Sequence, residues 1–118
     1  MLYTAALSVY EKAERKMKSY YIMPDLGNDA VVPDKSDLNQ YSNEAMSWEG
    51  LKVSYLAKLM KPEAEEWMKR VSFEAVGEDV ALISDEEDVK NCYRLLLAVM
   101  MMNMFSGQTE LSYAGELQ

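Results

Sequence analysis

The stretch from Ser84 to Gly107 constrains the fold of this chain more than any other. It opens Ser-Asp-Glu-Glu-Asp and becomes almost wholly apolar from Cys92 to Phe105. The Ser84 hydroxyl can accept a hydrogen bond from the backbone N–H of Glu87, whose carboxylate can reach back to Ser84, as at a capped helix start. Gly107 supplies a residue that readily adopts the left-handed conformation in which helices end. The pattern predicts a helix from Ser84 to Phe105.

This predicted helix has no obvious solvent-exposed side. Beyond Arg94, its only polar residue is Asn103. A helix that is apolar all round has to be surrounded by protein. We therefore expect one central helix, rich in methionine, with the other helices of the chain packed around it.

Periodicity and breaking residues predict further helices before it. Apolar residues recur at spacings of three and four over residues 2–21, which predicts a first helix. Pro24 disfavours helical geometry at the residue before it and so ends that helix. A second helix covers most of residues 34–60, starting at position 34, 36 or 42. Gly50 lies inside it and marks either a close helix crossing or a break between two shorter helices.

A third helix is predicted over residues 62–77. Pro62 suits the first position of a helix, acidic residues fill the first turn, and Gly77 ends it. A β-hairpin is the competing interpretation, because residues 71–75 alternate in polarity and residues 80–83 could pair back with them. The polar tail, residues 106–118, is expected to be flexible.

Together these elements predict an all-α fold. We expect one domain over residues 1–118, a small bundle of four to five helices around the apolar C-terminal helix. A minor β-hairpin near residues 71–83 is the alternative. The hydrophobic content of 49% is enough for a packed core.

The composition excludes several kinds of catalytic centre. The chain contains no histidine and a single cysteine, Cys92. Histidine-assisted nucleophilic catalysis, mixed Cys/His zinc sites and iron–sulfur sites are therefore excluded. A glycine-rich phosphate loop is also missing from the sequence. We predict no catalytic residue, no cofactor and no bound metal, and we expect Cys92 to behave as a small buried hydrophobe.

The net charge of −8 is concentrated in one part of the chain. Residues 63–88 carry ten acidic and two basic residues, a balance of −8. Such a balance argues against nucleic acid or an anionic membrane as the main partner, and it permits a basic protein. Met1 leads directly into Leu2-Tyr3 with no basic segment of a signal peptide. With a single cysteine, this predicts a cytoplasmic protein.

Acidic pairs at helical spacing offer one route to catalysis. Glu11 with Glu14, Glu63 with Glu66, and Asp85 with Asp88 each lie three residues apart. Two facing pairs could hold magnesium, as in all-α nucleotide pyrophosphohydrolases. Acids in the first turn of a helix are, however, expected for the helix dipole alone.

The sequence therefore favours a non-catalytic protein that binds and blocks or scaffolds a protein partner. In character it is similar to phage-encoded inhibitors of host defence and to bacterial immunity proteins, an analogy of type that no motif carries. The residues predicted to bind the partner are aromatic anchors and acidic side chains: Tyr20, Tyr21, Glu63, Glu65, Glu66, Trp67, Glu78, Asp79, Asp85, Glu86, Glu87 and Asp88. The alternatives are a structural subunit of a virion or ring, which implies a homo-oligomer, and a magnesium-dependent hydrolase.

Overall fold

The computed structural model describes residues 1–13, 15 and 17–118 and shows an α/β fold built on a parallel sheet. Along the chain the elements are β1 (Leu2–Ala6), α1 (Leu7–Lys12), β2 (Lys18–Tyr21), the 3-10 helix η1 (Asp29–Val31), α2 (Lys35–Ser42), α3 (Trp48–Leu59), α4 (Pro62–Gly77), β3 (Val80–Ser84), α5 (Tyr93–Phe105) and β4 (Tyr113–Glu116).

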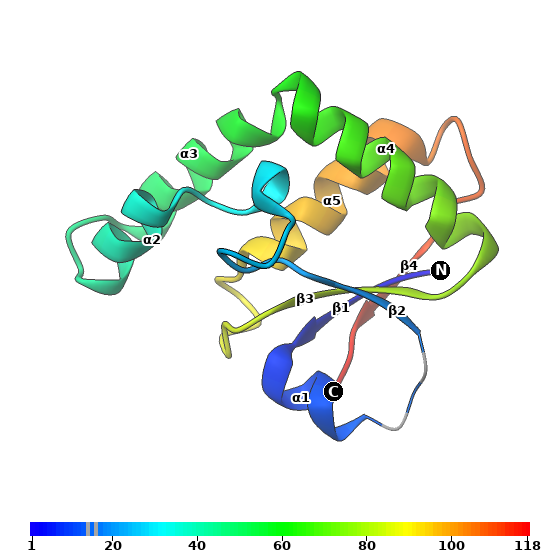
Figure 1. The fold of residues 1–118 in the computed structure, drawn as a ribbon, viewed down its shortest axis with the longest axis horizontal. Coiled ribbons are helices and arrows are strands. Elements are labelled where there is room, and N and C mark those ends of the chain that lie inside the picture. Colours follow the sequence, from blue (N-terminus) through cyan, green and yellow to red (C-terminus); the bar gives the residue numbers. More distant parts are fainter. Residues whose placement is uncertain (14, 16) are drawn as a thin grey trace.

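The four strands run parallel in the order β2-β3-β1-β4 (Figure 1). In the centre of the sheet, Leu2 of β1 is opposite Val80 of β3, and Ala6 is opposite Ser84. Every residue of β3 is buried. A strand covered on both faces has apolar residues at every position, which explains the uninterrupted run Val-Ala-Leu-Ile in β3.

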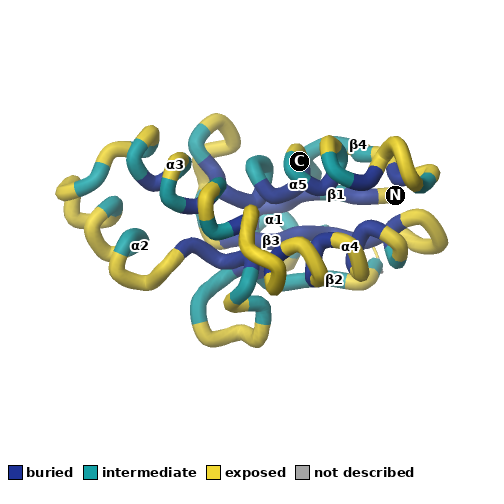
Figure 2. Tube along the Cα trace, turned by 90° about the horizontal axis from the view of Figure 1, so that it is seen from above, coloured by how far each residue is buried: buried dark blue, intermediate teal, exposed yellow. Residues whose placement is uncertain are grey.

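Helices cover the two faces of the sheet unequally. In Figure 1, α3, α4 and α5 lie above the sheet and α1 lies below it. The larger core packs Val80 and Leu82 against residues of the upper helices, such as Leu97. The smaller core places Ile83 and other residues of β1 and β3 against α1, through side chains such as Leu7. In Figure 2 the central strands β1 and β3 are largely buried, whereas the outer strands β2 and β4 are mostly intermediate.

The expectation of an all-α helical bundle is therefore wrong. Residues 2–21 are not one helix: they contain the strands β1 and β2, and within them the helix α1 spans only Leu7–Lys12. The helical spacing led to the wrong prediction, because a strand that is buried on both faces lacks the alternation of polar and apolar residues that identifies half-buried strands. Backbone pairing of β1 with β3 on one side and β4 on the other outweighs the local helical preference.

The predicted C-terminal helix is also shorter than expected. It begins at Tyr93, while Ser84 ends β3 and the four acids after it lie in a loop. One side of α5 remains open, since Val99 is 47% exposed, so the helix is not surrounded by protein. The hairpin alternative fails as well, because residues 71–75 belong to α4 and β3 pairs with parallel strands.

Helix α4 confirms the predicted start at Pro62 and end at Gly77. The break in the second predicted helix falls between α2 and α3, at residues 43–47, and not at Gly50. There the Ser47 hydroxyl caps α3 by accepting from the backbone N–H of Gly50 at 3.0 Å. The tail expected to be flexible contains β4, which pairs with β1. Across the described residues, every helix is too short or too polar to cross a bilayer.

Candidate functional site

Ligands of parallel α/β proteins commonly bind at the carboxyl ends of the strands, beside neighbouring strands whose connections leave to opposite faces, and β1 and β3 have this arrangement. The chain leaves β1 at Ala6 and enters α1 below the sheet, whereas it leaves the neighbouring β3 at Ser84 toward α5 above it (Figure 1). Adjacent strands whose connections depart to opposite faces create a gap at that edge. The loop of residues 85–92 follows β3 at this end of the sheet and carries most of the polar groups described below.

Glu86 is the central side chain of this loop. Its Oε1 accepts from the Ser84 hydroxyl at 3.0 Å, and both carboxylate oxygens accept from the Tyr93 backbone N–H, at 3.0 and 3.2 Å. Burial raises the pKa of Glu86 from 4.5 to about 7. Burial dominates even though these hydrogen bonds and the charge of Arg94 favour the ionised form. Glu86 therefore titrates near neutral pH.

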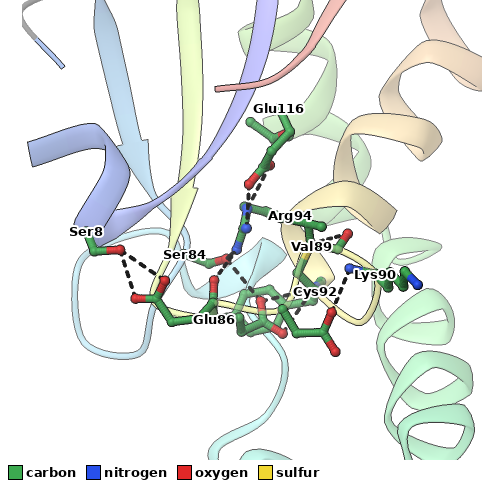
Figure 3. Close-up of polar contacts among 12 residues, drawn as sticks. Ser8, Ser84, Glu86, Val89, Lys90, Cys92, Arg94 and Glu116 are labelled. Atoms are coloured by element: carbon green, nitrogen blue, oxygen red, sulfur yellow. Dashed lines mark hydrogen bonds and ion pairs between the residues drawn. The ribbon is translucent and has the colours of Figure 1, made fainter. Parts of the chain in front are cut away.

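Arg94 ties three segments of the site together. It is fully buried, and its Nε and Nη2 donate to the two carboxylate oxygens of Glu116 in β4, at 3.1 and 2.6 Å. Its Nη1 donates to the Ser84 hydroxyl at 2.9 Å and to the Glu86 carbonyl at 2.8 Å (Figure 3). A buried guanidinium needs such partners to offset the loss of its hydration. Arg94 thus holds the backbone of the loop in place and acts as a positioning residue.

Two further contacts hold the loop. The Ser8 hydroxyl at the start of α1 donates to the carboxylate of Glu87 at 2.8 and 3.1 Å, which joins the loop to the lower face of the sheet. The Asp88 carboxylate accepts from the Lys90 backbone N–H at 2.9 Å (Figure 3). Cys92 is buried, and burial raises the pKa of its thiol, so it stays a protonated thiol at neutral pH.

A cleft of about 460 Å³ opens beside Glu86. The residues that line it come from the segment after β2, from α2 and from the β3–α5 connection: Pro24, Leu38, Asn39, Tyr41, Ser42, Asp85, Glu86 and Tyr93. Among these described residues, two are acidic and none is basic. The Tyr93 hydroxyl donates to the Ile22 carbonyl at 2.7 Å, so its ring is a fixed part of the wall. The cleft has the size of a small-molecule site.

The model of a known protein family, the domain of unknown function DUF488, matches residues 6–101. The chain belongs to the DUF488 family. The matched range contains the carboxyl edge of the sheet and the residues around Glu86, and it ends before β4 and Glu116. No curated protein and no solved structure matches the chain.

The acidic residues of this DUF488 chain do not form one surface. Glu78 and Asp79 precede β3, whereas Asp85 follows it, so these residues lie at opposite ends of this strand. Glu63, Glu65, Glu66, Glu78, Asp79, Asp85, Glu87 and Asp88 are exposed, and Glu86 is half-buried. Only the Asp85–Asp88 group of the predicted set therefore lies at the candidate site.

The predicted aromatic anchors belong mostly to the interior. Trp67 is 6% exposed, and its Nε1 donates to Asn28 at 3.2 Å, so it cannot serve as a surface anchor. The Tyr20 ring packs edge-on against Trp67 with 5.3 Å between centroids, and its hydroxyl donates to Glu74. Tyr21 is half-buried in the smaller core. Tyr20 and Tyr21 lie in the edge strand β2, and Trp67 lies on the buried side of α4. The prediction of a helix over residues 2–21 could not show this arrangement.

Sequence reasoning missed Arg94, Glu116 and Ser8 as parts of the site. Arg94 did leave a signal, because a charge inside an otherwise apolar helix needs a buried partner. The partner, Glu116, lies in a segment that was expected to be flexible, and no local sequence pattern indicates that it pairs with Arg94. Of the acidic pairs considered for magnesium, Asp85 and Asp88 lie in a loop, and Glu14 is outside the described residues. In the part of the chain that the structure describes, no group of three or more acidic or thiol ligands could hold a metal.

Proposed function

We propose that this DUF488 protein binds a small organic molecule in the cleft at the carboxyl edge of its sheet and exchanges a proton with it through Glu86. One observation carries the proposal: a carboxyl group with a pKa of about 7 forms part of the wall of a cleft of about 460 Å³. A titratable group whose pKa is shifted and which lies in a cavity is typical of functional sites. This departs from the non-catalytic function expected from the sequence, where the burial of Glu86 is invisible.

The lining indicates the chemistry of the ligand. Asp85 and Glu86 disfavour an anion and favour a cation or a molecule rich in N–H donors. The ring of Tyr41 offers an aromatic face on which a planar or cationic group can pack. The Asn39 amide adds both a donor and an acceptor. An organic amine or an amino-substituted ring fits all three features.

Proton exchange at Glu86 works in both directions near neutral pH. The ionised carboxylate accepts a proton from an N–H or O–H group of the ligand and becomes the neutral acid. The protonated form returns that proton to a basic atom. A group with a pKa near the working pH serves both steps best, and such catalysis contributes about 10²–10⁴-fold to a rate. The Ser84 hydroxyl donates to the Glu86 carboxylate and Arg94 donates to the Glu86 carbonyl, so these two residues hold Glu86 in place beside the cleft.

The test is NMR titration with benzamidine and benzylamine, and with benzoate as the anion of similar shape. We expect saturable shifts at cleft residues for the two cations and none for benzoate. Binding should tighten from pH 6 to pH 8 as Glu86 ionises. Glu86→Gln should weaken it by about tenfold, the value of one charge-assisted contact. Glu110→Gln removes an exposed acid outside the cleft and should leave it unchanged. Benzoate binding as tightly as the cations, or no binding of either cation, would refute the proposal.

A protein partner is the second candidate function, and the exposed side of α4, together with Met60 at the end of α3, favours it. Met60 and Phe73 are 69% and 50% exposed, and acidic Glu63, Glu65 and Glu66 lie between them in sequence. Glu66 and Phe73 are seven residues apart and thus share one side of the helix. Exposed apolar side chains beside charges are typical of protein-binding surfaces. We propose that this surface lets the protein block or scaffold a basic protein partner in the cytoplasm.

Charge reversal tests this second candidate. Reversing Glu65, Glu66 and Glu78 to Lys should slow association with a partner captured from host lysate and reduce the salt dependence of the association rate, because acidic side chains steer the encounter. An unchanged association rate would remove the steering role. The cleft titration is independent of this result, since these residues do not line the cleft.

A further inference from the structure

A second cavity lies between α3 and α5 and has no part in the cleft beside Glu86. It measures about 460 Å³ and is open to solvent along one side. Its walls are mainly apolar: Leu56 of α3 faces Leu96, Val99 and Met100 of α5 across it. Val99 is 47% exposed, and the other three are half-buried. We call this cavity the α3–α5 groove.

The α3–α5 groove carries positive charge in a strongly acidic protein. Lys52 and Lys90 line it, and no acidic side chain does so among the described residues. The chain as a whole has a net charge of −8, so two lysines without an acid in one cavity contrast with the rest of the molecule. A cavity lined by one sign of charge and by low-dielectric walls concentrates ligands of the opposite sign.

The two lysines lie toward one end of the groove. In Figure 1, α3 and α5 run in the same direction, so their first residues lie at one end and their last at the other. Lys90 precedes α5 and Lys52 lies in the first half of α3. Leu56, Val99 and Met100 lie further along the two helices. Apolar side chains thus line the groove along both helices, and its positive charge lies toward the end where the helices begin.

We propose that the α3–α5 groove binds an anionic amphiphile, a molecule with an acidic head group and an unbranched hydrocarbon chain. The head group lies between Lys52 and Lys90, and the chain extends between the two helices toward Asn103. Burial of the hydrocarbon chain against Val99 and its neighbours drives binding. The lysines select the sign of the head group. A free fatty acid and the head of an anionic lipid share this chemistry.

Trp48 provides a direct signal, because it lines the groove while Trp67, the other tryptophan, is 6% exposed in the core. The experiment titrates the full chain with decanoate below its micelle concentration and follows tryptophan fluorescence. Decyltrimethylammonium, with the same chain and the opposite charge, is the matched ligand control. We expect saturable binding of decanoate and at least tenfold weaker binding of the cation.

Variants separate the head-group contact from the chain contact. Replacing both Lys52 and Lys90 by Gln should weaken decanoate binding by about tenfold, the combined effect of two exposed charge pairs. Lys69→Gln removes an exposed lysine of α4, outside the groove, and should have no effect. Val99→Glu should abolish binding, with an unchanged circular dichroism spectrum showing that the fold is intact. Equal binding of the cation, unchanged binding by the double lysine variant, or no saturation would overturn the proposal.

Vesicles distinguish the two sources of the amphiphile. If the ligand is a free fatty acid, monomeric decanoate binds and phosphatidylglycerol vesicles do not retain the protein. If it is a lipid head at a membrane surface, vesicles of phosphatidylglycerol retain the protein and vesicles of phosphatidylcholine do not. Binding of an acidic amphipathic peptide in place of decanoate would overturn the assignment to an amphiphile.

Discussion

Replacing Glu86 by Gln tests the central electrostatic feature of the candidate site. Burial raises the pKa of Glu86 from 4.5 to about 7, so the folded protein binds this proton more tightly than the unfolded chain does. Between these two pH values the folded state therefore carries more protons. The free energy of unfolding must then fall as pH rises through this window.

The size of the effect follows from the same two values. A rise from 4.5 to about 7 costs the folded protein about 3 kcal/mol once Glu86 is ionised, at about 1.4 kcal/mol per pH unit. Gln has no charge to bury, and its carbonyl oxygen can still accept from Ser84 and from the Tyr93 backbone as Oε1 does. At pH 8, Glu86→Gln should be more stable than the wild type by up to about 3 kcal/mol. At pH 4 the two should agree within about 1 kcal/mol, because both side chains are then neutral.

Urea unfolding at several pH values between 4 and 8 measures this difference. Subtracting the two proteins at each pH cancels the other titrating groups, which they share. Glu110→Gln, an exposed position, serves as the control and should differ from the wild type by less than about 0.5 kcal/mol throughout. If the gap between Glu86→Gln and the wild type stayed constant from pH 4 to pH 8, Glu86 would not be desolvated. The proposed proton exchange would then lose its basis.

Three further predictions concern what holds the site in place, each measured by urea unfolding. Arg94→Met should lower the free energy of unfolding by about 3–5 kcal/mol, because it leaves the carboxylate of Glu116 without its buried partner, and a loss below about 1 kcal/mol would contradict this. Deleting residues 112–118 removes β4 together with Glu116 and should cost at least about 3 kcal/mol, whereas a truly flexible tail would be removed at no cost. Leu97→Ala creates a cavity at a fully buried position of α5 and should lower the free energy of unfolding by about 2–5 kcal/mol. Val99→Ala, on the exposed side of the same helix, should lower it by less than about 1 kcal/mol. Equal losses of stability in the two variants would contradict the position of the core.

Some local features of this chain are visible in the sequence and agree with the structure. Helix α4 begins at Pro62 and ends at Gly77 because a proline at the first position and a glycine at the last act within one or two turns of backbone. By contrast, Ser84 and Glu87 match a helix-capping pattern, yet Ser84 ends β3 and Glu87 binds Ser8 of α1. The same local pattern is compatible with the end of a strand, and the sequence alone could not distinguish a helix start from a strand end.

The candidate site depends on contacts between residues that are distant in sequence. The sequence predicts that Asp85 and Glu86 bind a partner, but the burial that raises the pKa of Glu86 comes from the folded surroundings. Arg94 and Glu116 are 22 residues apart, and their ion pair forms because β4 joins the sheet beside β1. An ion pair between distant residues leaves no periodic pattern in the sequence. An arginine or a glutamate of such a pair cannot be distinguished by sequence from one that is exposed to solvent in a helix or tail.

By itself the sequence determined the short-range and compositional facts: the position of α4, the apolar character of residues 80–83 and 95–102, and the absence of histidine chemistry. Only the tertiary structure decided that residues 2–6 and 80–84 are neighbouring parallel strands. It also decided that the acids after Ser84 form a loop at the carboxyl ends of these strands and that one of these acids, Glu86, is half-buried. The physical reason is the range of the interactions. Capping and backbone propensity act over a few residues, whereas parallel strand pairing and desolvation of a carboxylate depend on segments that folding brings together from far apart.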